Sequence, residues 1–155
     1  MQEKPEIEEA RKLVKRVNFV TLTTLDETGG PDTRLLFNLR KMRAKAIAGD
    51  AALEDEFATW LGTNTSSRKV AQIRRDARVC LYYTDSLKFQ GLSLKGRLEE
   101  VTDAAVKKAL WTPSWEQYYP GGLLGGDYSV LRFIPESGRY YHGLATTDFT
   151  CTGKM

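Results

Sequence analysis

Short apolar segments rich in β-branched and aromatic residues alternate along this chain with clusters of Gly, Pro, Asp and Asn. This pattern is typical of strands joined by turns. Strands are expected at 18–25, 33–39, 57–62, 78–83, 89–101 and 128–134, with a short edge strand at 139–141. Regular strand–helix–strand alternation, the signature of a parallel sheet, is absent. We therefore predict a mainly β protein with short helices, built as an antiparallel β-barrel.

Two helices are expected outside the strands, in addition to a short one at 70–75. The first covers 5–17, where Pro5 suits the first helical position and apolar residues recur on one face. The second is capped by Thr102 and runs to Leu110. The segment 42–55 is compatible with either a short strand or a helical turn.

A chain of 155 residues with 41% hydrophobic and 28% charged residues is expected to form one soluble domain. We assign this domain to 1–143 and expect a mobile tail at 144–155. Cys80 and Cys151 are isolated, and the first residues are too polar for a signal peptide, which together favour a cytoplasmic protein. A net charge of +3 with scattered basic residues disfavours a nucleic-acid partner, and no apolar run is long enough to span a membrane.

The segment 63–69, Thr-Asn-Thr-Ser-Ser-Arg-Lys, connects an expected strand to the expected helix at 70–75. Hydroxyl groups, free N–H groups and the positive end of a helix dipole together form a ready site for an anion. Arg68 and Lys69 add two full charges at the same place. The segment favours a phosphate monoester as ligand, although Ser-Ser is also an ordinary helix cap and Arg-Lys an ordinary solvated pair.

Arg34 is a second candidate because it interrupts the expected half-apolar strand at 33–39. The simple alternative is an arginine in solvent on an edge strand. If the two segments are neighbours, Arg34 converges with Thr63, Ser67, Arg68 and Lys69 on one phosphate group. The sequence thus predicts a site for a cofactor that carries a phosphate.

No catalytic residue can be assigned from the sequence. His142 is the only histidine, which excludes a site with two histidine ligands, and no motif supports a nucleophile–histidine relay. We predict no metal site. If this protein catalyses a reaction, a bound cofactor is expected to carry the chemistry.

The segments 63–73 and 78–83 resemble the FMN-binding segment of the pyridoxamine 5'-phosphate oxidase-like split β-barrel proteins, in which a strand, Thr-x-x-x-Ser-Arg/x-Lys, a helix and a further strand follow in order. The segments 33–36 and 94–99 resemble two further strands of that family. Similarity to its bacterial general stress protein branch lies in three segments: 110–111, 119–122 and 131–135.

By this resemblance the fold is an FMN-binding split barrel that forms a homodimer with two FMN sites at the interface. The resemblance implies that the cofactor phosphate is bound by five residues: Arg34, Thr63, Ser67, Arg68 and Lys69. It also implies that the backbone of Leu35 and Leu36 lies against the flavin and that Gln90 reaches it. Trp111, Trp115 and Tyr118 either wall the site from the partner subunit or pack within the core.

The implied function is an FMN-dependent oxidoreductase that acts on a small-molecule electron donor or acceptor. A non-catalytic module that binds flavin or haem in a stress response is the alternative. The chain departs from the true oxidases, which grip a substrate phosphate with Tyr-x-x-x-Arg-x-x-x-Ser and a late Arg-x-His. The corresponding regions at 103–110 and 140–148 lack these residues, so turnover of pyridoxamine 5'-phosphate is not expected.

Overall fold

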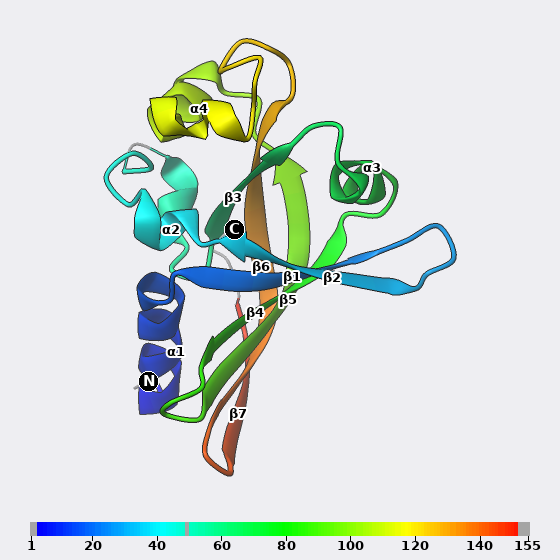
Figure 1. Ribbon diagram of the computed structural model, residues 1–155. Helices are drawn as coiled ribbons and strands as arrows, with labels where there is room; N and C mark the ends of the chain where they lie inside the picture. The colour runs from blue at the N-terminus through cyan, green and yellow to red at the C-terminus, as the bar shows by residue number, and fades with distance from the viewer. Residues whose placement is uncertain (1–2, 49, 152–155) are drawn as a thin grey trace.

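The computed structural model describes residues 3–48 and 50–151 and contains one strongly curved antiparallel sheet flanked by short helices (Figure 1). Its strands are β1 (Phe19–Leu25), β2 (Pro31–Phe37), β3 (Thr59–Asn64), β4 (Arg78–Asp85), β5 (Gln90–Glu100), β6 (Tyr128–His142) and β7 (Ala145–Thr150). Its α-helices are α1 (Pro5–Arg16), α2 (Leu39–Met42), α3 (Arg68–Arg75) and α4 (Ala104–Leu110). Two 3₁₀ helices, η1 (Ala51–Glu54) and η2 (Pro113–Gln117), complete the elements.

The strands follow the order β2-β1-β4-β5-β6-β3, and β7 pairs with β6 beside this path. Within the residues that the structure describes, β2 and β3 are not hydrogen-bonded to each other, so the barrel remains open between them. The prediction of an antiparallel split β-barrel with short helices is confirmed. The opening matters for function because side chains of both edge strands line one groove there.

The hairpin of β1 and β2 is defined by the turn that separates the two strands. Asp26 N donates to Gly30 O over 2.8 Å, and Gly29 has a φ of 82°, which a residue without a Cβ adopts readily. The resulting register places Leu22 opposite Arg34 and Phe19 opposite Phe37. This pairing sets which β2 side chains face α3.

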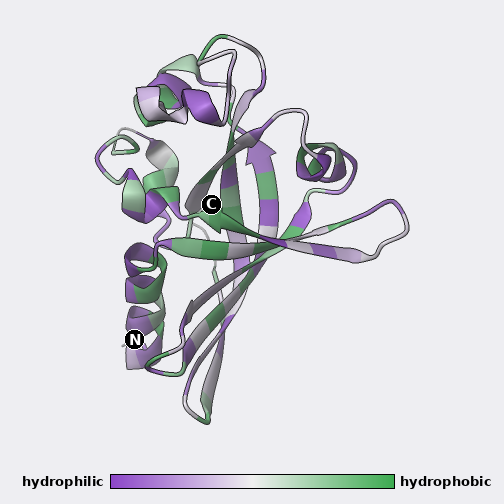
Figure 2. Cartoon of the chain, in the orientation of Figure 1, coloured by the Kyte–Doolittle hydropathy of each residue, from purple (hydrophilic) through white to green (hydrophobic). Residues whose placement is uncertain are grey.

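Buried side chains form two apolar clusters. Figure 2 shows hydrophobic positions, in green, distributed along the helices and strands that supply them. The larger one fills the barrel and includes Leu13 of α1, Leu81 of β4 and Phe133 of β6. The smaller one lies beneath α4 and η2 and includes Trp60 and Tyr128. The second cluster supports the aromatic segment that borders the groove.

The C-terminal strands differ from the sequence expectation. The segments at 128–134 and 139–141 are one strand, β6, which pairs with β5 and also with β3 and β7, so the second is not an edge strand. Pro135 and Gly138 interrupt its pattern, but Pro135 pairs with Gly96 beside a bulge at 95/96, where the ladder tolerates it.

Two further expectations are corrected. Within the expected tail at 144–155, Ala145–Thr150 form β7, because Phe149 covers the barrel cluster and the strand hydrogen-bonds along β6. Residues 152–155 lie outside the described residues. Asp103, not Thr102, caps α4, since its side chain accepts from Ala105 N over 2.8 Å.

Candidate functional site

A groove of about 360 Å³ opens where β2 and β3 fail to pair. One wall comes from β2, the opposite wall from the end of β3, and the rim from the aromatic segment after α4. The lining residues are Phe19, Leu35, Leu36, Phe37, Leu39, Gly62, Thr63, Asn64, Lys69, Trp115, Tyr118 and Tyr119. Their predominantly apolar and aromatic character suits a flat, largely apolar ring.

A second, cationic pocket of about 370 Å³ adjoins this groove, and Lys69 lines both. We call it the cationic pocket and define it by Asp32, Thr33, Arg34, Arg68 and Lys69. Three cations therefore face a single carboxylate. An apolar groove that continues into a cationic pocket can hold a ring at one end and an anion at the other.

The turn between β3 and α3 is held by Asp127, which precedes β6. Asn64 Nδ2 donates to Asp127 Oδ2 over 2.8 Å, and Ser66 N donates to Asp127 Oδ1 over 2.8 Å. Ser67 begins α3 as its N-cap, yet its side chain makes no capping bond. The Ser67 hydroxyl, 3.5 Å from Thr63 Oγ1, thus keeps hydrogen-bonding capacity for a ligand.

Arg34 is held in place by a buried polar network. Its NH1 donates to Thr24 Oγ1 over 2.7 Å, and its NH2 lies 3.4 Å from Gln72 Oε1. Thr24 also donates to Gln72, and both of these side chains are almost wholly buried. Burial lowers the pKa of Arg34. The charge of Asp32 acts in the opposite direction and raises this pKa, whereas repulsion from Arg68 lowers it further. The simple alternative of a free solvated arginine does not hold.

Lys69 is half-buried at the junction of groove and pocket. Its Nζ donates to Thr63 Oγ1 over 2.7 Å. Burial, followed by repulsion from the nearby Arg34, lowers the pKa of Lys69. Two partly desolvated cations held beside each other destabilise the site until an anion lies between them.

Arg68 differs from its two cationic neighbours. Its side chain is 80% exposed, and NH1 lies 3.8 Å from Asp32 Oδ2. Asp32 in turn accepts from Gln72 Nε2 over 2.7 Å. Arg68 is therefore free to turn toward a ligand, whereas the carboxylate of Asp32 is fixed from behind.

The aromatic rim belongs to the same chain as the rest of the groove. Trp115, Tyr118 and Tyr119 line the groove, while Trp111 packs behind them with its ring centroid 5.0 Å from that of Tyr128. Burial, aided by Asp127, raises the pKa of Tyr119 to about 12, so its hydroxyl remains a donor at neutral pH. Within one chain, Trp111 supports the wall and does not line it.

Gln90 lies apart from the groove and the pocket. It is buried at the start of β5, where Nε2 donates to Tyr140 Oη over 2.7 Å and Oε1 accepts from Arg16 over 2.8 Å. His142, the single histidine, is exposed at the end of β6 and lines neither cavity. The structure thus brings together seven of the nine sequence-derived candidates, which line the two cavities or border them, whereas Trp111 and Gln90 do not.

Sequence reasoning missed several members of the site. Phe19, Phe37 and Tyr119 line the groove, Asp32 lines the cationic pocket, and Gln72 supports it from behind. Asp32 lies two residues before Arg34, so the period of two in a strand could have placed it on the face of Arg34, had the strand been expected to begin at Pro31. Among residues 3–48 and 50–151, no cluster of three His, Cys, Asp or Glu side chains suits a metal ion.

Comparisons with known proteins bear on the family and the fold. A family model described as Pyridoxamine 5'-phosphate oxidase matches residues 7–142. The solved structure of a protein related to general stress protein 26, from Clostridium acetobutylicum, is 35% identical, with a TM-score of 0.73 over 97% of this chain and 96% of that one. No curated protein matches the chain.

Two more distant structures share the fold. General Stress Protein 26 from Bacillus anthracis has a TM-score of 0.69 at 13% identity, covering 93% of this chain and 99% of that one. A heme binding protein from Mycobacterium smegmatis has a TM-score of 0.70 at 20% identity, covering 97% of this chain and 60% of that one. At these identities the likeness concerns the fold alone.

Proposed function

Because this chain belongs to the pyridoxamine 5'-phosphate oxidase family, in its general stress protein 26 branch, we propose that it is an FMN-binding oxidoreductase. The observation that carries the proposal is the direct continuation of the apolar groove into the cationic pocket through Lys69. FMN has the matching shape, with a flat ring system at one end and a phosphate dianion at the other. Its electron donor or acceptor is a small molecule of unknown identity.

The residues present fit FMN on their donor chemistry. Arg34 and Lys69 supply charged donors that are already partly desolvated, and Thr63 and Ser67 add hydroxyl groups. Arg68 completes the phosphate contacts by turning from Asp32 toward the ligand. Charged hydrogen bonds contribute about 1.5–3 kcal/mol each, so three or four supply roughly the 8 kcal/mol of micromolar binding before entropic costs. Contacts between the groove and the ring have to offset those costs.

The groove provides the environment for the ring. Leu35 and Leu36 of β2 lie on one side, and Trp115 and Tyr118 form the aromatic rim. When bound, FMN supplies hydride or electron transfer, which this chain's own side chains cannot perform. The protein's contribution is to hold the phosphate, orient the ring and exclude water from one side of it.

We propose a homodimer as the functional form. Three large apolar side chains that line the groove remain exposed in one chain: Phe19 at 47%, Leu35 at 63% and Phe37 at 43%. Tyr118 on the rim is 51% exposed as well. A second copy that covers this surface would bury the apolar side chains and close the groove over the ring.

Turnover of pyridoxamine 5'-phosphate is not part of the proposal. Such a substrate needs cationic donors for a second phosphate beside the ring. Lys107 and Lys108 of α4 lie in the region where the true oxidases bind the substrate phosphate, yet neither lines the groove or the cationic pocket. The Nζ atom of Lys107 lies 5.7 Å from the centroid of the Tyr128 ring. The cationic pocket that adjoins the groove is taken by the cofactor phosphate in this proposal.

A non-catalytic module for flavin or haem is the second candidate, and the fold shared with a heme binding protein is the observation that favours it. Haem iron is commonly held by His, Cys or Met, and none of these lines the groove in the part of the chain that the structure describes. The three cations suit haem propionates as well as a phosphate, so the comparison rests on the iron ligand. Flavin therefore fits this site better.

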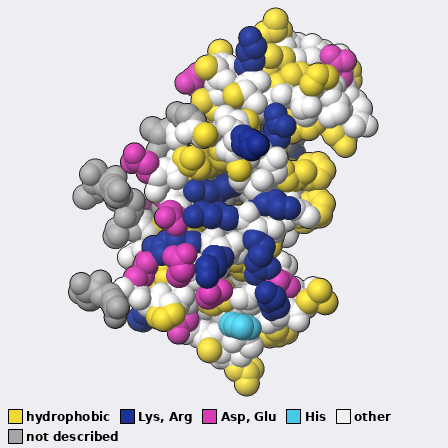
Figure 3. Space-filling model, turned by 90° about the vertical axis from the view of Figure 1, so that its left-hand side faces the viewer, with side chains coloured by type: hydrophobic (Ala, Val, Ile, Leu, Met, Phe, Trp, Pro, Cys, Tyr) yellow, Lys and Arg dark blue, Asp and Glu magenta, His cyan; other side chains and the backbone are white. Residues whose placement is uncertain are grey.

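Nucleic acid and membranes are not among the proposed partners. Figure 3 shows Lys and Arg side chains intermixed with Asp and Glu on the face over α1 and α2. On α1, Lys12 pairs with Glu9 at 3.3 Å and Lys15 pairs with Glu56 at 3.2 Å. No helix of the described residues is long and apolar enough to cross a bilayer. We propose the cytoplasm as the location, consistent with the free thiols of Cys80 and Cys151.

The experiment is reconstitution of the purified protein with FMN, followed by absorbance and fluorescence titration. Micromolar binding of FMN with much weaker binding of riboflavin supports the proposal, and reduction of the bound flavin by NAD(P)H distinguishes an oxidoreductase from a storage module. Absence of flavin binding contradicts it. Formation of pyridoxal 5'-phosphate at enzymatic rates would show that the protein is a true oxidase.

A further inference from the structure

Asp32 is a carboxylate in a pocket otherwise built for an anion. It lines the cationic pocket together with Arg34, Arg68 and Lys69, and its side chain is 31% exposed. A carboxylate that faces an anionic ligand costs binding energy, because like charges repel. Its presence there calls for a physical reason, since an Asn of the same shape would carry no such cost.

The carboxylate is held in place from behind. Gln72 Nε2 donates to Asp32 Oδ2 over 2.7 Å, and Gln72 is only 3% exposed. The same buried amide accepts from Thr24 and lies 3.4 Å from Arg34 NH2. Asp32 and Arg34 are therefore fixed relative to each other by one side chain, and Asp32 cannot simply swing away from a ligand.

Position along β2 determines which part of a ligand Asp32 meets. Asp32, Arg34 and Leu36 are alternate residues, so they share the half-buried face of the strand at steps of about 7 Å. Leu36 lines the groove, whereas Arg34 and Asp32 line the cationic pocket. A ligand with its ring in the groove meets Arg34 and Lys69 first, and Asp32 lies beyond them.

We infer that Asp32 is a specificity-determining residue that restricts the cationic pocket to ligands ending in a single phosphate group. Three cations against one carboxylate leave two positive charges in excess, which matches a phosphate monoester dianion. A second phosphate, joined through a bridging oxygen, enters the region bounded by Asp32 and is repelled there. The inference rests on the proposed FMN function only for the position of the ring in the groove. The charges of the cationic pocket act on any ligand that carries a phosphate.

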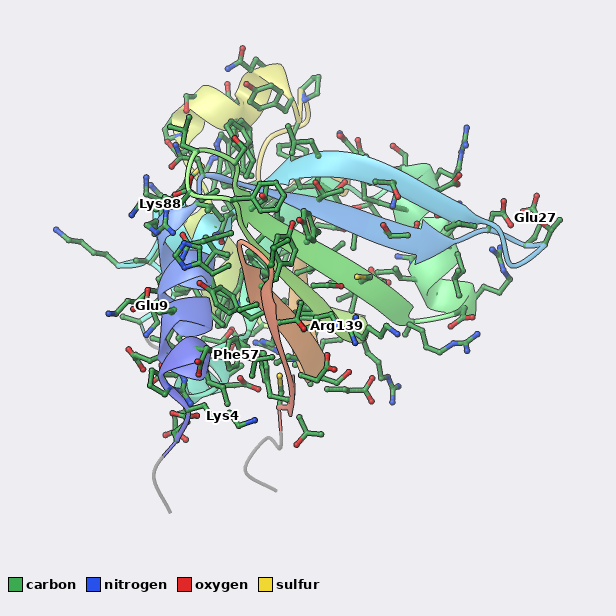
Figure 4. The ribbon with its side chains drawn as sticks, turned by 90° about the horizontal axis from the view of Figure 1, so that it is seen from below. Lys4, Glu9, Glu27, Phe57, Lys88 and Arg139 are labelled. Atoms are coloured by element: carbon green, nitrogen blue, oxygen red, sulfur yellow. The ribbon has the colours of Figure 1, made fainter. Side chains whose placement is uncertain are left out.

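The test compares Asp32→Asn with the unaltered protein at pH 8. Asparagine keeps the oxygen that accepts from Gln72 and removes the charge. The matched control is Glu27→Gln, because Glu27 is a carboxylate of the same hairpin that lies at its far tip, outside the pocket (Figure 4). Calorimetry measures inorganic phosphate and pyrophosphate, and fluorescence titration measures FMN, FAD and riboflavin.

We expect Asp32→Asn to strengthen pyrophosphate and FAD binding by about tenfold and phosphate and FMN binding by less than about threefold. The affinity of Asp32→Asn for riboflavin should equal that of the unaltered protein. The control Glu27→Gln should bind every ligand as the unaltered protein does. If Asp32→Asn alters single-phosphate and diphosphate ligands by equal factors, or weakens both, the inference is overturned. Absence of phosphate and pyrophosphate binding in both proteins also overturns it.

Failure of this inference can be told apart from failure of the proposed function. Loss of FMN binding in the unaltered protein, with the pyrophosphate effect intact, contradicts the function and leaves the inference standing. Tight FMN binding, with no gain in affinity for diphosphate ligands in Asp32→Asn, overturns the inference and leaves the proposed function standing. Thermal unfolding verifies that the variant is folded. If it is not, Asp32→Ser removes the same charge, and the same shift in favour of pyrophosphate is required of it.

Discussion

Lys69 Nζ donates a hydrogen bond of 2.7 Å to Oγ1 of Thr63, which fixes the ammonium group of α3 at the end of β3. Thr63 is buried, and Lys69 borders both the apolar groove and the cationic pocket. The hydroxyl group therefore orients a charge that is partly removed from water. Arg34, fixed by Thr24 on a different strand, meets this charge from the other side of the pocket.

Replacing Lys69 by Met should weaken FMN binding by about 1.5–3 kcal/mol, the usual contribution of a hydrogen bond to a charged group. Riboflavin, which lacks the phosphate, should lose far less. Arg68→Gln should cause a smaller loss for FMN, because its side chain is 80% exposed and screened by water. Fluorescence titrations of both ligands measure these effects, and equal losses for FMN and riboflavin in Lys69→Met would contradict the assignment.

FMN affinity should fall as the pH rises through the lowered pKa of Lys69, because the charged form is the one that binds the phosphate. In the absence of ligand, the folded chain binds fewer protons than the unfolded chain between this pKa and the ordinary lysine value of about 10.4. The free energy of unfolding therefore gains a contribution that rises with pH across that window. Titrations of FMN from pH 7 to 10 test the first effect, and Lys69→Met should flatten the profile.

The parts of the fold that the sequence predicts are those governed by local patterns. Alternation of apolar residues located the strands, and the hydroxyl and cationic residues between β3 and α3 pointed to the cationic pocket because they are adjacent in sequence. The pattern predicts two separate segments, 128–134 and 139–141, where the structure has the single strand β6. The pairing of Pro135 with Gly96 beside a bulge explains how a proline fits within that strand.

The supporting network could not be predicted, because it depends on pairing between distant segments. Gln72 and Asp32 are 40 positions apart, and Gln72 is one polar residue among several on α3. Its side chain is buried and hydrogen-bonded to β1 and β2 only when these strands pack against that helix. The same holds for Trp115 and Tyr118, whose place on the rim of their own chain's groove requires the aromatic segment to fold back over β3.

Replacing Gln72 by Leu should lower the free energy of unfolding by about 1–3 kcal/mol, because Thr24 loses an acceptor inside the fold and Asp32 loses a donor. Arg34 should also lose its orientation, so FMN affinity should fall more than riboflavin affinity. The control is Ala71→Leu on the exposed side of the same helix, with a change within about 0.5 kcal/mol. Urea denaturation measures stability, and an unchanged midpoint for Gln72→Leu would show that the network is not a stabilising one.

The last prediction concerns the proposed dimer. Leu35 is 63% exposed on β2, so Leu35→Glu should cost one chain little stability while placing a charge in the surface that a second copy covers. Light scattering should then find a folded monomer in place of the dimer, with flavin bound weakly because its groove stays open. The matched control is Leu144→Glu, since Leu144 is fully exposed between β6 and β7, away from the groove, and this variant should remain dimeric. A dimer that persists in Leu35→Glu would place the interface elsewhere. An unaltered protein that is monomeric and binds FMN tightly would show instead that one chain suffices to form the site.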